Sequence, residues 1–182
     1  ERAIEYFEAA LDADVTEKLG DAFPEVERIY RKMAISTDRE QEKRRICKEL
    51  ERAYRRMLHR IADSGVDLEN QIKFKLWKGL GEIYHSHLNF EKNWRESAIK
   101  AFRTASQLRP DNERVRLLLA DLESQRSNVE AVVEQHRALL EHEPFRIESY
   151  KALFDAYMDA KQYDRAWCIA SALVFLEQAS PR

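Results

Sequence analysis

The sequence predicts an all-α protein, and three observations lead to that fold class. The 182 residues include only 4 Gly and 4 Pro, the two residue types that helix interiors tolerate least. Apolar residues recur at i, i+3 and i+4, the spacing of amphipathic helices, along almost the whole chain. No β-rich segment and no low-complexity linker interrupts this pattern, so we expect a single helical domain over residues 1–182.

About nine helices are expected, and turn and capping residues separate them. Ser36, Thr37 and Asp38 can cap the third helix, Gly65 follows it, and Pro110 lies between two later helices. The expected ranges are 1–12, 19–33, 38–63, 69–87, 93–108, 111–124, 127–142, 145–159 and 162–178.

An internal repeat underlies these helices, because Pro110 and Pro144 lie 34 residues apart. That distance is the period of a helix-turn-helix unit with the pattern W-x2-L-G-x2-Y, then A-x3-F-x2-A, then P. The matching residues of one unit are Trp77, Leu80, Gly81, Tyr84, Ala98, Phe102, Ala105 and Pro110.

On these residues the chain resembles tetratricopeptide repeat proteins, strongly over 74–178 and more weakly before that. The resemblance implies a right-handed superhelical solenoid of antiparallel helix pairs. Because the chain opens on mid-helix sequence, we interpret it as a fragment of a larger array, which we expect to be bacterial. The units are a half-unit 1–15, a divergent unit 19–63, and units 69–110, 111–144 and 145–178.

In that family the first helix of each unit lines a concave groove, which usually holds a peptide. The resemblance therefore implies a set of groove residues here: Lys75, Lys78, Glu82, His85, Arg114, Leu117, Asp121, Ser124, Glu148, Lys151, Asp155 and Met158.

Three of these residues share one offset in successive units, namely Glu82, Asp121 and Asp155. One hypothesis is a ladder of carboxylates that grips a peptide with basic side chains. The alternative is that Lys78 and Lys151, each one turn earlier, form ordinary i,i+4 pairs with their acids.

Two features depart from an ideal helix pair. Gly79 and Gly81 lie inside an expected helix; Gly81 marks a close approach of a neighbouring helix, and Gly79 leaves room for a ligand or a neighbour. The stretch from Tyr84 to Ala98 is five residues longer than the repeat requires. It either extends both helices or forms a projecting corner, and its aromatic residues Phe90 and Trp94 form a candidate contact site.

Catalytic and metal-binding patterns are not found, so we expect no enzyme, no metal and no cofactor. His85 and His87 lie two apart on a helix, which is the wrong spacing for shared ligation. His136 takes a core position of the repeat, and Cys47 and Cys168 are expected as small buried residues.

Composition limits the setting in which the protein works. The net charge of -2 favours neither nucleic acid nor an anionic membrane. Two cysteines, no signal peptide and no long apolar span favour a reducing, cytoplasmic location. The third helix has a basic side formed by Arg45, Lys48, Arg52, Arg56 and His59.

The expected function is a non-catalytic scaffold that binds a partner protein or peptide in its concave groove. One alternative is self-association through an open solenoid end, since Ile4, Phe7 and Leu11 of the opening half-unit would lack a partner helix. The second alternative is docking of nucleic acid or acidic lipid on the basic side of 38–63. A solvated outer surface is the favoured explanation of that side, because surface helices commonly carry a charged face opposite an apolar one.

Overall fold

The computed structural model describes residues 19–63, 70–89 and 91–179. These residues form eight helices and no strand, which confirms the all-α fold class. The helices are α2 Leu19–Ser36, α3 Glu40–Asp63, α4 Asn70–Ser86, α5 Trp94–Leu108, α6 Glu113–Ser124, α7 Val129–His142, α8 Ile147–Asp159 and α9 Tyr163–Ala179. The helix expected at 1–12, with Ile4, Phe7 and Leu11, lies outside the described residues.

Asparagine side chains cap the starts of α6 and α7. Asn112 precedes α6, and its side-chain oxygen accepts a hydrogen bond from the amide of Val115 at 3.1 Å. Asn128 caps α7 in the same way through the amide of Ala131 at 3.4 Å. Such caps satisfy amides that the first helical turn leaves without a partner.

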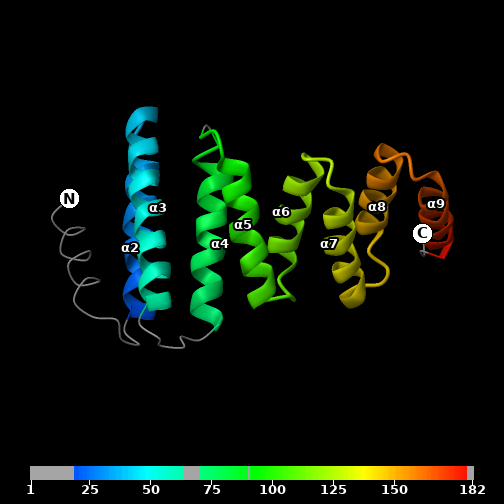
Figure 1. Cartoon of the computed structure of the whole chain (residues 1–182), viewed down its shortest axis with the longest axis horizontal. Helices are drawn as coiled ribbons and strands as arrows, with labels where there is room; N and C mark the ends of the chain where they lie inside the picture. The colour runs from blue at the N-terminus through cyan, green and yellow to red at the C-terminus, as the bar shows by residue number, and fades with distance from the viewer. Residues whose placement is uncertain (1–18, 64–69, 90, 180–182) are drawn as a thin grey trace. The chain divides into compact units, whose positions relative to one another are not determined.

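Helices that are consecutive in the chain pack as neighbours, in pairs such as α4 with α5 and α8 with α9 (Figure 1). The chain divides into two compact units, of which the first ends at Leu108 and the second begins at Arg109. We describe each unit by itself.

The core of the first unit is built around its two tight glycines. An added Cβ at Gly81 would lie 2.6 Å from the Phe102 ring, which confirms the close approach expected there. An added Cβ at Gly79 would lie 2.3 Å from the Tyr54 hydroxyl. The space beside Gly79 is therefore filled by a neighbour, Tyr54 of α3, and not left for a ligand.

The second unit has a smaller core between α6, α7, α8 and α9. Leu119 and Val132 are buried in it, and a separate cluster joins Leu153, Tyr157 and Ala166. His136 is buried as expected, with its Nδ1 3.3 Å from the Ser149 hydroxyl.

The long connection between α4 and α5 is a corner. Residues 87–93 separate these two helices, whereas residues 160–162 separate α8 from α9. Phe90 lies outside the described residues. Leu88 is fully buried, and Trp94 is the first residue of α5 and only half-buried, so the corner is anchored by an aliphatic residue.

The expectation for Cys168 is wrong, because its side chain is exposed, whereas Cys47 is buried as expected. The core side of α9 is formed by Ala166 and Ile169, which pack with α8. Cys168 follows at about 100° per residue around the helix and falls outside that contact.

Candidate functional site

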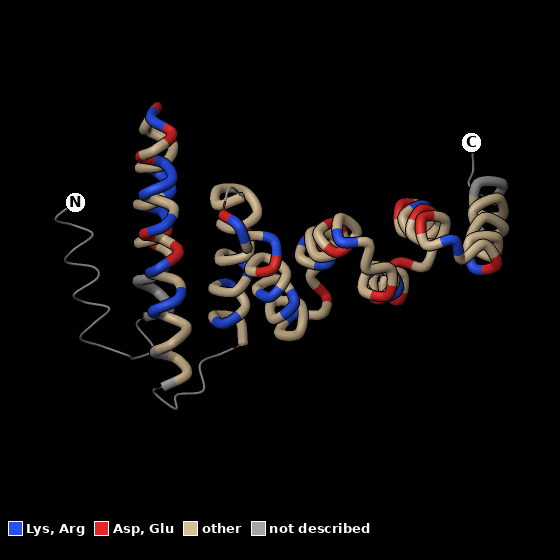
Figure 2. The backbone as a smooth tube through the Cα atoms, turned by 45° about the horizontal axis from the view of Figure 1, so that its top comes forward, with Lys and Arg blue, Asp and Glu red and all other residues tan. Residues whose placement is uncertain are grey.

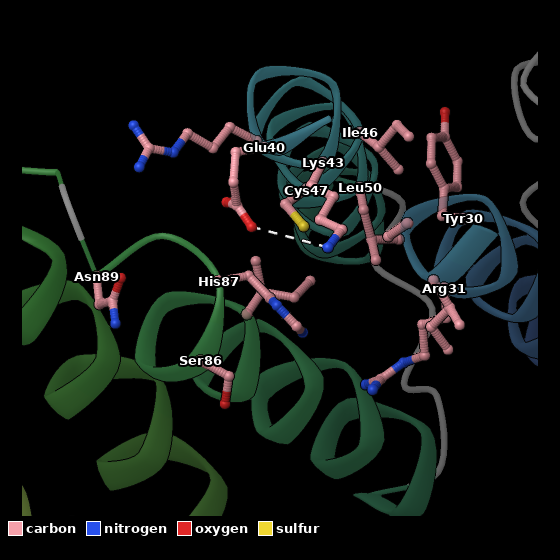
Figure 3. Close-up of a pocket in the computed structure, with 14 residues that line it drawn as sticks. Tyr30, Arg31, Glu40, Lys43, Ile46, Cys47, Leu50, Ser86, His87 and Asn89 are labelled. Atoms are coloured by element: carbon pink, nitrogen blue, oxygen red, sulfur yellow. Dashed lines mark ion pairs between the residues drawn. The ribbon is translucent and has the colours of Figure 1, made fainter. Parts of the chain in front are cut away.

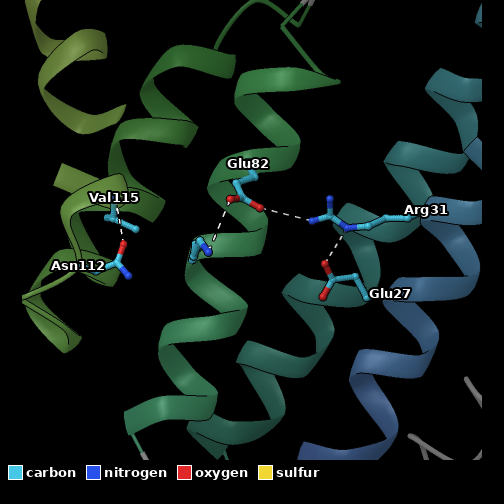
Figure 4. A network of polar contacts seen from close by, with 6 residues as sticks. Glu27, Arg31, Glu82, Asn112 and Val115 are labelled. Carbon is cyan, nitrogen blue, oxygen red and sulfur yellow. Dashed lines mark hydrogen bonds and ion pairs between the residues drawn. The ribbon is translucent and has the colours of Figure 1, made fainter. Parts of the chain in front are cut away.

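The expected groove face of α4 meets the neighbouring helix α2 through charged side chains. Glu82 lies 3.4 Å from Arg31 Nη2 of α2 and 3.9 Å from Lys78 Nζ, one turn earlier on α4. Arg31 Nε also donates to Glu27 at 2.7 Å. These four residues form a row that we call the charged row (Figure 4).

Of these four residues, Lys78 and Glu82 were expected in the groove from the repeat pattern, whereas Glu27 and Arg31 were not. In the structure Arg28 pairs with Glu25 on its own helix, and Arg31, one turn later, reaches Glu82. The i,i+4 spacing of Glu27 and Arg31 was the available signal for this pair.

Tyr54 of α3 lies against Gly79 of α4, close to Glu27 and Arg31 of the charged row. Its side chain is fully buried against Gly79, and burial together with the nearby Glu27 carboxylate raises the pKa of its phenol far above the usual value. The phenol therefore stays protonated and neutral, because burial disfavours the charged phenolate. Because Gly79 has no side chain, the Tyr54 ring has room to pack against α4.

A pocket of about 550 Å³ opens between α2, α3 and the end of α4 (Figure 3). Its apolar lining comes from all three helices and includes Ile46 and Leu50 of α3 and Ile83 of α4. Arg31 belongs both to this lining and to the charged row, so the two features are continuous.

Charged and polar residues surround the apolar lining. Glu40 and Lys43 form an ion pair of 3.7 Å, which Figure 3 shows facing the space above His87. Burial, and then the Arg31 charge, lower the pKa of His87, so its imidazole is neutral at pH 7. Burial raises the pKa of the Cys47 thiol, which makes it a packing residue and not a nucleophile.

A second hollow lies between α3, α4 and α5 and contains the corner residue Trp94. The Tyr84 hydroxyl donates to Glu51 at 2.5 Å and accepts from Arg55 Nη2 at 2.6 Å. Burial and the Glu51 carboxylate raise the pKa of Tyr84 to about 12. The Tyr84 hydroxyl, Glu51 and Arg55 therefore satisfy one another at the edge of this hollow.

Trp94 is held from two sides in this hollow. Its ring lies edge-on to the His85 ring with centroids 6.3 Å apart, and the Arg95 guanidinium lies 5.1 Å from its centroid. His85, expected as a groove residue, therefore contacts the first residue of α5.

Lys and Arg are concentrated along α3 (Figure 2). Arg45 pairs with Glu49 at 3.2 Å, and Lys48 pairs with Glu91 of the corner at 2.5 Å. Arg52 is exposed and lines two adjoining hollows of this face, while Arg56 and His59 are exposed farther along it. Acidic neighbours thus offset part of the basic side that the sequence indicates.

The groove residues of the second unit lie on the accessible sides of α6 and α8. Asp121 accepts a hydrogen bond from Gln125 at 3.0 Å and does not pair with a basic residue there. All the others are exposed except Leu117, which is half-buried; they are Arg114, Ser124, Glu148, Lys151, Asp155 and Met158. In the first unit Lys75 is exposed on α4.

Among the residues that the structure describes, no group of three or more His, Cys, Asp or Glu side chains is placed to hold a metal ion. None of the described helices is both long enough and apolar enough to cross a membrane.

The helix pairs define a helical-repeat fold. The chain resembles the crystal structure of MamA, a protein with tetratricopeptide repeats, with a TM-score of 0.57 and 16% sequence identity; the match covers 97% of this chain and 87% of that one. A second crystal structure of MamA protein matches with a TM-score of 0.48 and 16% identity, over 83% of this chain and 91% of the other. At this identity the likeness shows the fold alone. No protein-family model and no curated protein matches the chain.

Proposed function

We propose that the protein is a non-catalytic scaffold that binds a segment of a partner protein on its first unit. The observation that carries this proposal is the apolar pocket of about 550 Å³ that is continuous with the charged row. Ligand pockets of proteins are typically 300–1,000 Å³, mostly apolar, with a few polar groups that fix orientation. This pocket has that composition.

The titratable groups of this unit support binding over catalysis. The Cys47 thiol and the Tyr84 hydroxyl both have raised pKa values, so both are protonated at neutral pH. A nucleophile or a general base needs the opposite shift or a pKa near 7.

The partner segment would insert one large apolar side chain between Ile46, Leu50 and Ile83. Its flanking polar groups would meet Arg31 and the Glu40–Lys43 pair at the rim. A buried anchor with a charged surround is the arrangement that supplies most of the affinity at protein interfaces.

A screen for peptides that bind the full chain tests the proposal, followed by affinity measurements on a pocket-filling variant. Ala34 lines the pocket and is half-buried, so Ala34→Phe fills part of the space. We expect the selected peptides to lose about tenfold or more in affinity, since one deleted anchor contact is worth about 1.4 kcal/mol or more. Lys32→Ala, on the exposed side of the same helix, is the control and should bind normally.

The carboxylate ladder of Glu82, Asp121 and Asp155 is a separate part of the proposal and has its own test. Glu82 already has Arg31 and Lys78 as neighbours, whereas Asp121 is exposed without such a pair. If a peptide with basic side chains uses the ladder, the double reversal Glu82→Lys with Asp121→Lys should weaken its binding. Unchanged affinity in this double variant removes the ladder and leaves the pocket proposal standing.

The basic side of α3 supports a second candidate, the docking of nucleic acid or acidic lipid. It rests on the hollow that Arg44, Arg45, Lys48 and Arg52 line together. Binding through phosphates weakens steeply with added salt. Anisotropy of labelled single-stranded RNA at about 50 mM salt is the test of nucleic-acid docking, and no binding there by the wild-type chain removes that part of the alternative.

A further inference from the structure

The last helix, α9, carries the most apolar exposed surface of the second unit. Trp167 is 75% exposed, Phe175 69%, Tyr163 59% and Val174 55%. Monomeric proteins rarely expose several large apolar side chains together unless the patch is an interaction site. We call these four residues the α9 stripe.

The 34-residue repeat shows what this surface does elsewhere in the same unit. Subtracting one period from Tyr163, Trp167 and Val174 gives Val129, Val133 and Leu140 of α7. These three α7 residues are partly buried and pack against the cluster of Leu153, Tyr157 and Ala166 in α8 and α9. The α9 stripe therefore occupies the positions with which a repeat contacts its neighbour.

The stripe is also complementary to itself. Tyr163 and Trp167 precede a pair of small residues, Ala170 and Ser171, and Val174 and Phe175 follow that pair. Residues 163, 167, 170 and 174 follow the 4-3-4 spacing with which two helices pack along a seam. In an antiparallel pair centred on the small residues, Trp167 of each helix would lie beside Val174 of the other.

We propose that the α9 stripe binds the α9 stripe of a second copy of this chain about a two-fold axis between Ala170 and Ser171. A two-fold contact uses the same patch on both subunits, so the patch must be self-complementary. Residues 166–176 contain no charged side chain, so two copies bring no like charges together along this length.

The available area sets the strength of this contact. Aromatic side chains bury about 150–250 Å² each, so three that are roughly two-thirds exposed offer roughly 400 Å² per copy. The total of roughly 800 Å² is below the usual 1,200–2,000 Å² of stable complexes. The dimer is therefore a reversible one, which forms as the concentration rises.

Sedimentation velocity of the full chain from about 5 to about 500 µM tests the proposal over the range where small interfaces associate. The weight-average mass should rise toward that of a dimer and stay at the monomer value in Trp167→Glu. The matched control is Ile35→Glu, at an apolar residue of the first unit that is 82% exposed, which should dimerise like the wild type. Circular dichroism checks that each variant is folded.

Cross-linking tests the geometry independently of a charge change. In a Cys168→Ser background, Ser171→Cys places one accessible thiol beside the two-fold axis, and mild oxidation should give a disulfide-linked dimer. Arg165→Cys in the same background, on another side of α9, should not. A chain that stays monomeric at about 500 µM overturns the proposal. So does a dimer that survives Trp167→Glu and does not cross-link through residue 171.

Discussion

At the scale of single residues, each of the two helical glycines makes room for an aromatic ring of a neighbouring helix. Gly81 makes room for the Phe102 ring, and Gly79 makes room for the Tyr54 ring. Both rings are fully buried, so neither can turn away when a methyl group is added. The pattern of the repeat predicted the first contact; the second depends on α3, whose sequence diverges from the pattern.

Gly79→Ala should therefore destabilise the fold. Alanine gains about 1 kcal/mol in helix propensity, but overpacking against a rigid buried ring typically costs 1–3 kcal/mol. We expect a net loss of roughly 1 kcal/mol in urea unfolding. Combining Gly79→Ala with Tyr54→Ala should give a smaller loss than the sum of the two single losses, and strict additivity would contradict the steric explanation.

The buried His136 predicts a pH dependence of stability. Burial, and then the Arg146 charge, lower the pKa of His136 in the folded state. In the unfolded chain the imidazole has its ordinary pKa of about 6.5, so below that pH the unfolded chain binds more protons than the folded one. The free energy of unfolding therefore falls as the pH drops through about 6.5. Thermal unfolding at pH 7.5, 6.5 and 5.5 measures the slope, which should flatten in His136→Phe. A small slope remains from His87, whose pKa is lowered in the same direction.

At the scale of helices and turns, the connection between α4 and α5 is the main departure from the repeat. The extra residues form a corner that is anchored by the buried Leu88. Trp94 stands at its end with contacts to His85 and Arg95, and remains half accessible. Trp94 therefore packs against its neighbours with one part of its side chain and exposes another part, which a partner can contact.

Trp94→Ala should cost less stability than a true core deletion. Phe102 is fully buried, and removing such an aromatic side chain typically costs 3–5 kcal/mol. For the half-buried Trp94 we expect roughly half of that loss, measured by urea unfolding beside Phe102→Ala. Equal losses, with partner binding unchanged, would show that Trp94 is a core residue and not a contact site.

At the scale of the whole molecule, contacts are local along the chain, since within each of the two compact units a helix packs chiefly with its neighbours in sequence. Stability in such proteins is close to a sum over units and their nearest neighbours. A defect in one unit should therefore spread only to adjacent helices.

Leu153→Ala tests this locality. Leu153 is buried in the cluster with Tyr157 and Ala166, and its truncation should cost about 2–5 kcal/mol. We expect faster amide hydrogen exchange in α7, α8 and α9, while α4 and α5 keep their protection. Equal loss of protection in all five helices would mean that the chain unfolds as one cooperative body.

Much of the architecture could be predicted from the sequence because its signals are local. The spacing of apolar residues and the positions of Pro110 and Asn112 act over a few residues, and the described helices begin and end within a few residues of the expected ranges. The repeat pattern likewise identified Tyr84, Ala98, Phe102 and Ala105 as core residues, and all four are buried.

Other features depend on how one helix is placed against another, so they are visible only in the tertiary structure. The meeting of Arg31 with Glu82, the pocket between α2, α3 and α4, and the exposure of Cys168 all belong to this group. Each depends on rotation about a helix axis and on which neighbour is present, and a single residue of shift turns a side chain by about 100°. Local sequence signals are enough to set the helices and their order, whereas the packing between helices sets which side chains form the candidate sites.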